Sequence, residues 1–227
     1  MRILNLATAA AMMSIAVPAY AQSARDHLVT AAFSARDKPS ALASVTAALA
    51  SADATLARDP ANREARLQRA LATGYRGKLR RNRADVQAAR RQFEALVASN
   101  PRDAEAQMAL GGWHLGSIIE LGSLIARTGL GARKEQGFQA MVASLGAGGG
   151  RAIFPAYACL TRILIDPSDI AGARALAESA VGGRVARPED RIMQRNAATL
   201  LPLLRPGNGK AAAALAHKLM PFGAFAR

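Results

Sequence analysis

The sequence predicts an all-α protein, and three observations support this fold class. Alanine, which loses no side-chain entropy in a helix, accounts for 54 of the 227 residues. Apolar residues recur at steps of three or four, and no stretch shows the sustained alternation of a β-strand. Prolines, glycines and asparagines divide the chain into about ten helical segments. With 51% apolar residues, the chain has enough material for a core of one domain or two small ones.

The first 21 residues have the three-part pattern of a secretory signal peptide. Met1-Arg2 is a short positive start, residues 3–17 are mostly apolar, and Ala19-Tyr20-Ala21 offers the small residues that signal peptidase reads. We therefore expect cleavage between Ala21 and Gln22 and export, with the bacterial periplasm as the expected compartment. The alternative is an uncleaved anchor, although the stretch is shorter than the roughly 20 apolar residues that a span needs. Cleavage removes one arginine, so the net charge changes from +14 to +13.

Five pairs of helices are expected in residues 22–227, which read as a single helical domain with no transmembrane segment. The first long helix carries an apolar stripe, and Asp59-Pro60 ends it. Pro188 with Glu189 and Asp190 predicts a helix start, because proline and carboxylates suit the first turn. Short loops make neighbouring helices antiparallel. The predicted pairs are 24–36 with 40–57, 62–76 with 84–98, 103–126 with 132–145, 151–165 with 168–180, and 188–204 with 209–219.

Residues in the second pair have the spacing of a known repeat. Leu71 and Tyr75 match the first half of the tetratricopeptide pattern, with alanine in place of its glycine. Ala89, Phe93 and Pro101 match the second half, at steps of four and eight residues. The chain thus resembles a tetratricopeptide-repeat (TPR-like) protein over about residues 40–115, and more weakly beyond.

The resemblance implies a right-handed α-solenoid of about five antiparallel hairpins. The next repeat begins at Leu110-Gly111, where His114 replaces the tyrosine. This is 39 residues after Leu71, whereas the usual repeat is about 34. We expect the five extra residues in a loop over 78–83.

No motif for catalysis, metal or cofactor binding is found in the sequence. The three histidines are scattered, there is one cysteine, and neither glycine-rich stretch has the residues of a phosphate-binding loop. We therefore predict no catalytic residue, metal or cofactor. Catalytic groups converge in space rather than in sequence, so an enzyme with a hidden site stays open as an alternative. The single thiol, Cys159, lies in an apolar helix face and is expected to be structural.

Three regions are candidates for contact with partners. Trp113 and His114 lie among three glycines, a pattern that favours close helix packing, with a ligand groove as the alternative. Arg80, Arg81 and Arg83 belong to a basic cluster that suits an acidic partner, phosphate or anionic lipid, or is only a solvated surface. The apolar segment 219–225 is expected to cover the last hairpin, with a recognition tail as the alternative.

Taken together, these features favour an exported, non-catalytic TPR-like scaffold that binds a protein or peptide on a helical groove, and the basic cluster favours an acidic partner. Export disfavours nucleic acid as a partner. The first alternative is a ligand-binding accessory of a periplasmic transport or envelope-assembly system, which would take a small molecule. The second is the enzyme with a hidden site.

Overall fold

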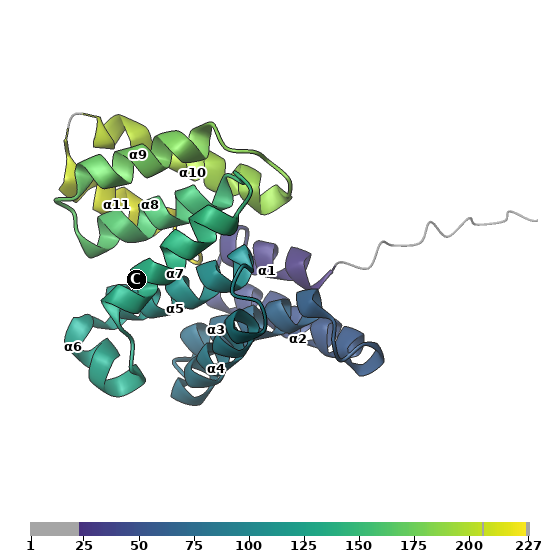
Figure 1. Ribbon diagram of the computed structural model, residues 1–227. Helices are drawn as coiled ribbons and strands as arrows, with labels where there is room; N and C mark the ends of the chain where they lie inside the picture. The colour runs from purple at the N-terminus through teal and green to yellow at the C-terminus, as the bar shows by residue number, and fades with distance from the viewer. Residues whose placement is uncertain (1–22, 206, 226–227) are drawn as a thin grey trace, which may run out of the picture.

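The computed structural model describes residues 23–205 and 207–225, and these form helices without a β-strand (Figure 1). The predicted signal peptide and its cleavage site, Ala21 and Gln22, lie outside the described residues. The elements are α1 (Ala24–Phe33), α2 (Lys38–Arg58), α3 (Arg63–Arg80), α4 (Arg83–Ser99), α5 (Ala104–Leu121), α6 (Ser123–Ile125), the π-helical turn η1 (Ala126–Leu130), α7 (Lys134–Ala147), α8 (Ile153–Ile165), α9 (Ile170–Val181), α10 (Pro188–Leu204) and α11 (Gly209–Leu219).

Short polar side chains start most of the helices. Asp37, Asn62 and Asn82 accept hydrogen bonds from backbone N–H groups in the first turns of α2, α3 and α4. Such caps satisfy N–H groups that have no partner within the helix. The helices α10 and α11 have the bounds that the turn residues predicted, and the all-α class is confirmed for the described residues.

The largest differences from the predicted helix boundaries lie at the ends of α3 and α5. The expected loop over 78–83 is mostly helical, because α3 continues to Arg80 and only Arg81 and Asn82 separate it from α4. The extra residues after Arg76 therefore extend α3 and do not form a loop. The helix expected over 103–126 ends at Leu121, since Gly122 has a positive φ of 78° that turns the chain into α6 and η1.

The helices pack in chain order around three apolar clusters. Each of the pairs α1–α2, α3–α4, α5–α7 and α8–α9 is in contact, as are α2–α3, α4–α5 and α9–α10. One cluster lies within α8–α11, one within α3–α5, and one joins α1, α2 and α3 to residues of the C-terminal tail, which we define as residues 220–225. Figure 1 shows α8–α11 lying over one side of the other helices.

Alanine is the commonest residue in these contacts. In α2, the buried residues are Ala41, Val45, Ala48 and Ala52, which face α1 and α3. Among the described helices, α2 alone is long and apolar enough to cross a membrane, judged by length and composition only. The four buried side chains of α2 are small, and each is at most 1% exposed.

Candidate functional site

Nine charged side chains meet at one end of the molecule, where five helices begin. Arg25 is in the first turn of α1, Glu105 in that of α5 and Glu189 in that of α10, while Arg151 stands two residues before α8. These helices and α3 thus point their positive ends at a common place, where carboxylates are favourable. The ion cluster consists of Arg25, Arg63, Glu64, Asp103, Glu105, Arg151, Arg187, Glu189 and Asp190.

Arg25 is the centre of the ion cluster. Its Nε lies 2.7 Å from a carboxylate oxygen of Glu64, its Nη2 is 2.9 Å from Glu105, and its Nη1 is 2.6 Å from Glu189. One guanidinium therefore joins α1 to α3, α5 and α10. On the other side of Glu105, Arg151 Nη1 donates to Oε1 over 2.7 Å, and Arg151 Nε lies 3.1 Å from Asp190.

The ion cluster holds Glu105 ionised. Burial by itself would raise the pKa of Glu105, but attraction from Arg25 and hydrogen bonds from Arg151, Arg25 and Arg63 outweigh it and lower that pKa to about 2. Burial by itself would lower the pKa of Arg25, but hydrogen bonds and attraction from Glu64 and Glu105 outweigh this effect and raise that pKa. Near neutral pH, Glu105 is therefore a fixed charge and has no proton to donate.

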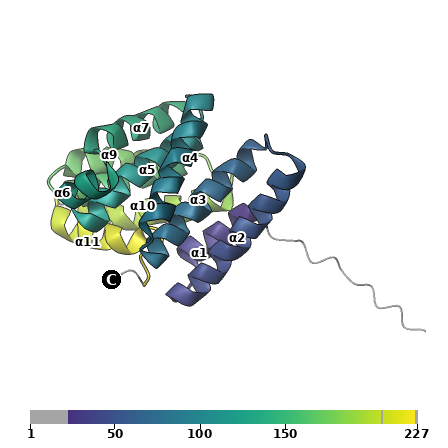
Figure 2. The same ribbon diagram turned by 90° about the horizontal axis from the view of Figure 1, so that it is seen from below.

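Helices α1, α3 and α5 end at the opposite end of the molecule. Lys78 Nζ, near the end of α3, lies 2.8 Å from Glu120 Oε1, near the end of α5. The C-terminal tail packs here, since Phe222 N donates to Ala32 O of α1 over 2.8 Å. The ring of Phe222 meets Tyr75 of α3 edge-on, with 4.8 Å between ring centres. The tail therefore connects the last helix to the first and third (Figure 2).

This position of the tail corrects part of the prediction for segment 219–225. Leu219 and Met220 pack on the apolar cluster of α8–α11, as expected of a cover for the last hairpin. Phe222 and Phe225 instead belong to the cluster formed with α1, α2 and α3. Phe222 is 1% exposed and has a φ of 66°, an unusual conformation for a side chain of this size.

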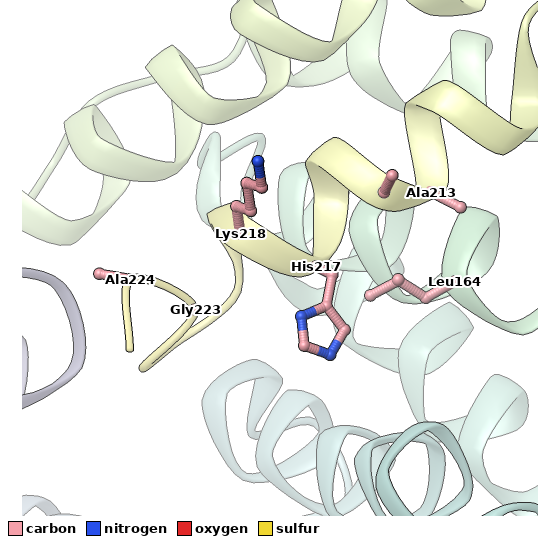
Figure 3. Close-up of a pocket in the computed structure, with 7 residues that line it drawn as sticks. Leu164, Ala213, His217, Lys218, Gly223 and Ala224 are labelled. Atoms are coloured by element: carbon pink, nitrogen blue, oxygen red, sulfur yellow. The ribbon is translucent and has the colours of Figure 1, made fainter. Parts of the chain in front are cut away.

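A cleft of about 680 Å³ opens beside the tail. Figure 3 shows His217 of α11 pointing into it on the same side as Leu164 of α8, with Gly223 and Ala224 at its edge. The complete lining is Leu164, Ala213, Ala214, His217, Lys218, Gly223 and Ala224. The cleft is mainly apolar and has one imidazole and one ammonium group, a composition that suits an apolar peptide more than a charged metabolite.

Two partly buried tyrosines, Tyr75 of α3 and Tyr157 of α8, lie between the helices near the tail. Burial raises the pKa of Tyr75 to about 12. Burial, with Tyr75 and Glu120 nearby, also raises the pKa of Tyr157 in α8. A side chain added at Gly112 of α5 would stand 2.8 Å from the hydroxyl oxygen of Tyr157, so this glycine makes room for the ring. Neither tyrosine lines the cleft beside the tail. We call this cleft, together with the surface of α1, α2 and α3 on which Phe222 packs, the inner groove.

A second, polar pocket of about 390 Å³ lies between α4, α5 and α7. His114 lines it, and its Nδ1 accepts a hydrogen bond of 3.2 Å from Arg133 N. Burial, and then repulsion from Arg90, lower the pKa of His114 to about 4. The ring is therefore neutral at physiological pH with its proton on Nε2. The other lining residues are Arg90, Glu94, Gln107, Leu110, Gln136, Gln139, Ala140 and Ala143.

Trp113 is a packing residue, as the sequence favoured. It is 8% exposed, its Nε1 donates to Val86 O over 2.8 Å, and the Arg90 guanidinium lies 5.2 Å from its ring centre. Its neighbour His114 is also buried, yet it borders the polar pocket, so the ligand-groove alternative remains a prediction for His114.

The glycines around Trp113 have the packing role predicted for them, with one exception. A Cβ at Gly111 would lie 2.9 Å from the carbonyl oxygen of Gly137, where α5 crosses α7, and Gly112 faces Tyr157. At Gly116 a Cβ would meet no atom within 4 Å. Close approach thus explains the first two glycines and not the third.

The three candidate arginines of the basic cluster are exposed. Arg80 ends α3, Arg81 is its left-handed cap with φ of 54°, and Arg83 begins α4. None of the three forms an ion pair with another described residue. Within the same region, Arg76 is bound to Asp85 over 2.7 Å and Lys78 to Glu120. A role of the three arginines in binding an acidic partner stays a prediction.

The ion cluster was not predicted from the sequence. Its ion pairs join residues that are far apart in the chain, such as Arg25 and Glu189. Glu189 and Asp190 were interpreted only as first-turn charges of a helix. The available signal was that helix starts near residues 63, 104 and 188 all carry carboxylates. Among the described residues, no group of three or more potential metal ligands is found.

Comparisons with known proteins do not assign the chain to a family. No family model, no curated protein and no solved structure matches the sequence or the fold.

Proposed function

We propose that this protein is an exported, non-catalytic helical-repeat protein, a right-handed TPR-like solenoid of antiparallel hairpins, that binds a short aromatic peptide of a protein partner in its inner groove. The residues 1–21 serve as the signal peptide. The observation that carries the proposal is the C-terminal tail, a non-helical segment whose phenylalanines already occupy a surface made by other helices.

The tail has the properties of a bound peptide. Its backbone forms a hydrogen bond with another helix, as a bound peptide would, from Phe222 N to Ala32 O of α1. The Phe222 ring packs against Tyr75. The Lys78 ammonium lies 5.8 Å from the centre of the same ring. Helical-repeat proteins recognise peptides by pockets for a few large side chains, and aromatic anchors contribute most of the affinity in such contacts. A partner peptide with two similarly spaced aromatic residues would fit the same surface.

The test uses the whole chain with the double substitution Phe222→Ala/Phe225→Ala, which weakens the tail without removing it. The probe is a fluorescent peptide with the sequence of residues 219–225, measured by polarisation. Since a tethered tail competes at an effective concentration on the order of millimolar, we expect the variant to bind the probe at least tenfold more tightly than the wild type. The exposed substitution Val142→Ala is the matched control, because 67% of Val142 is exposed.

Two results would count against peptide binding. One is that a folded variant, checked by circular dichroism, does not bind the probe. The other is that a probe with both phenylalanines replaced by alanine binds equally well. If the double variant does not fold, Phe225→Ala alone serves, because Phe225 is less buried than Phe222.

The polar pocket favours a second candidate function, that of a small-molecule accessory in a transport or envelope-assembly system. Its amide groups from Gln107, Gln136 and Gln139 would hydrogen-bond a polar ligand, with the neutral His114 as a further donor. Native mass spectrometry of the protein purified from its own cells tests this. A retained small molecule that is lost on Gln136→Ala would support it, and an empty protein would oppose it.

A further inference from the structure

The ends of α3 and α5 form a surface that differs in chemistry from both pockets. The 2.8 Å contact between Lys78 and Glu120 fixes these two ends beside each other. Just beyond Glu120, α6 and η1 project from the packed helices (Figure 1). We call residues 121–130 the apolar knob.

The apolar knob exposes three of the five large hydrophobic side chains that are most accessible in the described residues. The exposed fractions are 43% for Leu121, 74% for Leu124 and 61% for Ile125. None of them lines either pocket. They stand on a projection rather than in a recess, so they are shaped to insert into a partner and not to receive one.

The knob has a defined structure, although its apolar side chains have few contacts. Ala126 is fully buried, and its carbonyl accepts a hydrogen bond of 3.0 Å from Ala132 N. The Arg90 guanidinium donates to the carbonyl oxygens of Leu130 and Gly131, over 3.3 Å and 3.4 Å. The exposure of Leu124 and Ile125 is thus a feature of the fold itself.

Unpaired cations accompany the knob. Arg127 lies within it and is exposed. Two to five residues after Lys78, Arg80 ends α3, Arg81 caps it and Arg83 begins α4, and all three are exposed. The acidic residues nearby, Asp85 and Glu120, are paired with Arg76 and Lys78. None of the four arginines has an ion-pair partner among the described residues. This end therefore combines projecting aliphatic groups with uncompensated positive charge.

We propose that this end of the protein docks on a bilayer of anionic phospholipid, with Leu124 and Ile125 inserted at the boundary between headgroups and acyl chains and the arginines on the headgroup phosphates. Segments that lie in a membrane interface have this combination of aliphatic and basic side chains. An acidic peptide would pair with the arginines but would leave the projecting aliphatic side chains in water. The net charge of +14, or +13 after cleavage, adds a long-range attraction to the same surface.

The experiment measures co-sedimentation with vesicles of phosphatidylglycerol and phosphatidylethanolamine, compared with phosphatidylcholine alone. It uses the chain from Gln22 onwards, which contains every described helix, so that residues 3–17 do not contribute. We expect Leu124→Glu/Ile125→Glu to reduce binding to anionic vesicles at least tenfold. Val142→Glu is the matched control, because this residue is equally exposed on α7 and should bind as the wild type does.

A second variant separates the two contributions. Arg80→Ala/Arg81→Ala/Arg83→Ala should weaken binding at low salt, and the difference from the wild type should largely disappear at about 0.5 M salt, where charges are screened. All changed residues are exposed, so circular dichroism should show unaltered helix content.

The proposal is overturned if the wild type does not bind anionic vesicles, or binds neutral and anionic vesicles alike. It is also overturned if the glutamate variant binds as the wild type does, or if the knob instead captures a protein in the absence of lipid. These outcomes are independent of peptide binding in the inner groove, which uses other residues and another probe.

Discussion

Replacing Arg25 with methionine removes the cation that joins four helices at the ion cluster. Methionine keeps most of the length and apolar stem, so the substitution tests the charge rather than the volume. It leaves Glu189, which is 4% exposed, without its shortest ion pair, and it removes one of the three arginines that donate hydrogen bonds to Glu105, which is 8% exposed. Removal of one partner from a buried ion pair typically costs about 3 to 5 kcal/mol, and we expect a loss of that size near neutral pH.

The pH dependence provides the sharper test. The pKa of Glu105 falls from 4.5 to about 2 on folding, which corresponds to about 3 kcal/mol of stability at roughly 1.4 kcal/mol per unit. Because the folded pKa is the lower one, this stability is present above pH 4.5 and is lost as the pH falls toward 2. Without Arg25 the shift is smaller, so the free energy of unfolding should depend less on pH in the variant.

The assay is urea unfolding followed by far-ultraviolet circular dichroism between about pH 7 and pH 2.5. Arg58→Met is the control, since Arg58 is exposed and pairs with no described residue, and it should change the free energy of unfolding by less than about 0.5 kcal/mol. The difference between Arg25→Met and the wild type should shrink as acid neutralises the carboxylates. If Arg25→Met costs no more than the control, or if its cost does not change with pH, the reasoning is refuted.

Three further predictions concern single residues. Gly111→Ala should destabilise the protein, because the added Cβ would lie 2.9 Å from the carbonyl oxygen of Gly137, whereas Gly116→Ala has open space and should stabilise it by up to about 1 kcal/mol. Thermal melts of the two variants measure this, and a Gly111→Ala variant more stable than Gly116→Ala would contradict the close crossing of α5 and α7. Burial raises the pKa of Cys159 to about 12, so the thiol of the native protein should not react with iodoacetamide near neutral pH but should react fully in urea. Rapid labelling of the native protein would instead show that the thiol is accessible. His114 should titrate near pH 4 in nuclear magnetic resonance spectra, and because its folded pKa is the lower one, the free energy of unfolding should decrease as the pH falls from 6.5 toward 4. A titration near pH 6.5 would mean that the imidazole is solvated.

Local signals in the sequence predicted the helices well. Pro188 and the turn before Gly209 placed the bounds of α10 and α11 correctly, because proline and caps act through a few neighbouring residues. The interpretation of Trp113 and of two glycines as packing residues was also confirmed. The prediction of a loop over 78–83 was wrong. An arginine-rich stretch has no signal that distinguishes a longer helix from a loop, and arginine is a good helix former.

By itself, the sequence determined the fold class and the order of the helices, since alanine content, apolar spacing and capping residues are local properties. Only the tertiary structure decided which charges are buried. Arg25 and Glu189 come within 2.6 Å although 164 residues separate them, and nothing local distinguishes Arg25 from the exposed Arg58. The tertiary structure likewise decided that Phe222 packs against Tyr75, and that Leu124 stays in solvent. Local spacing predicts the face of a helix, but the element that covers this face depends on how distant segments pack.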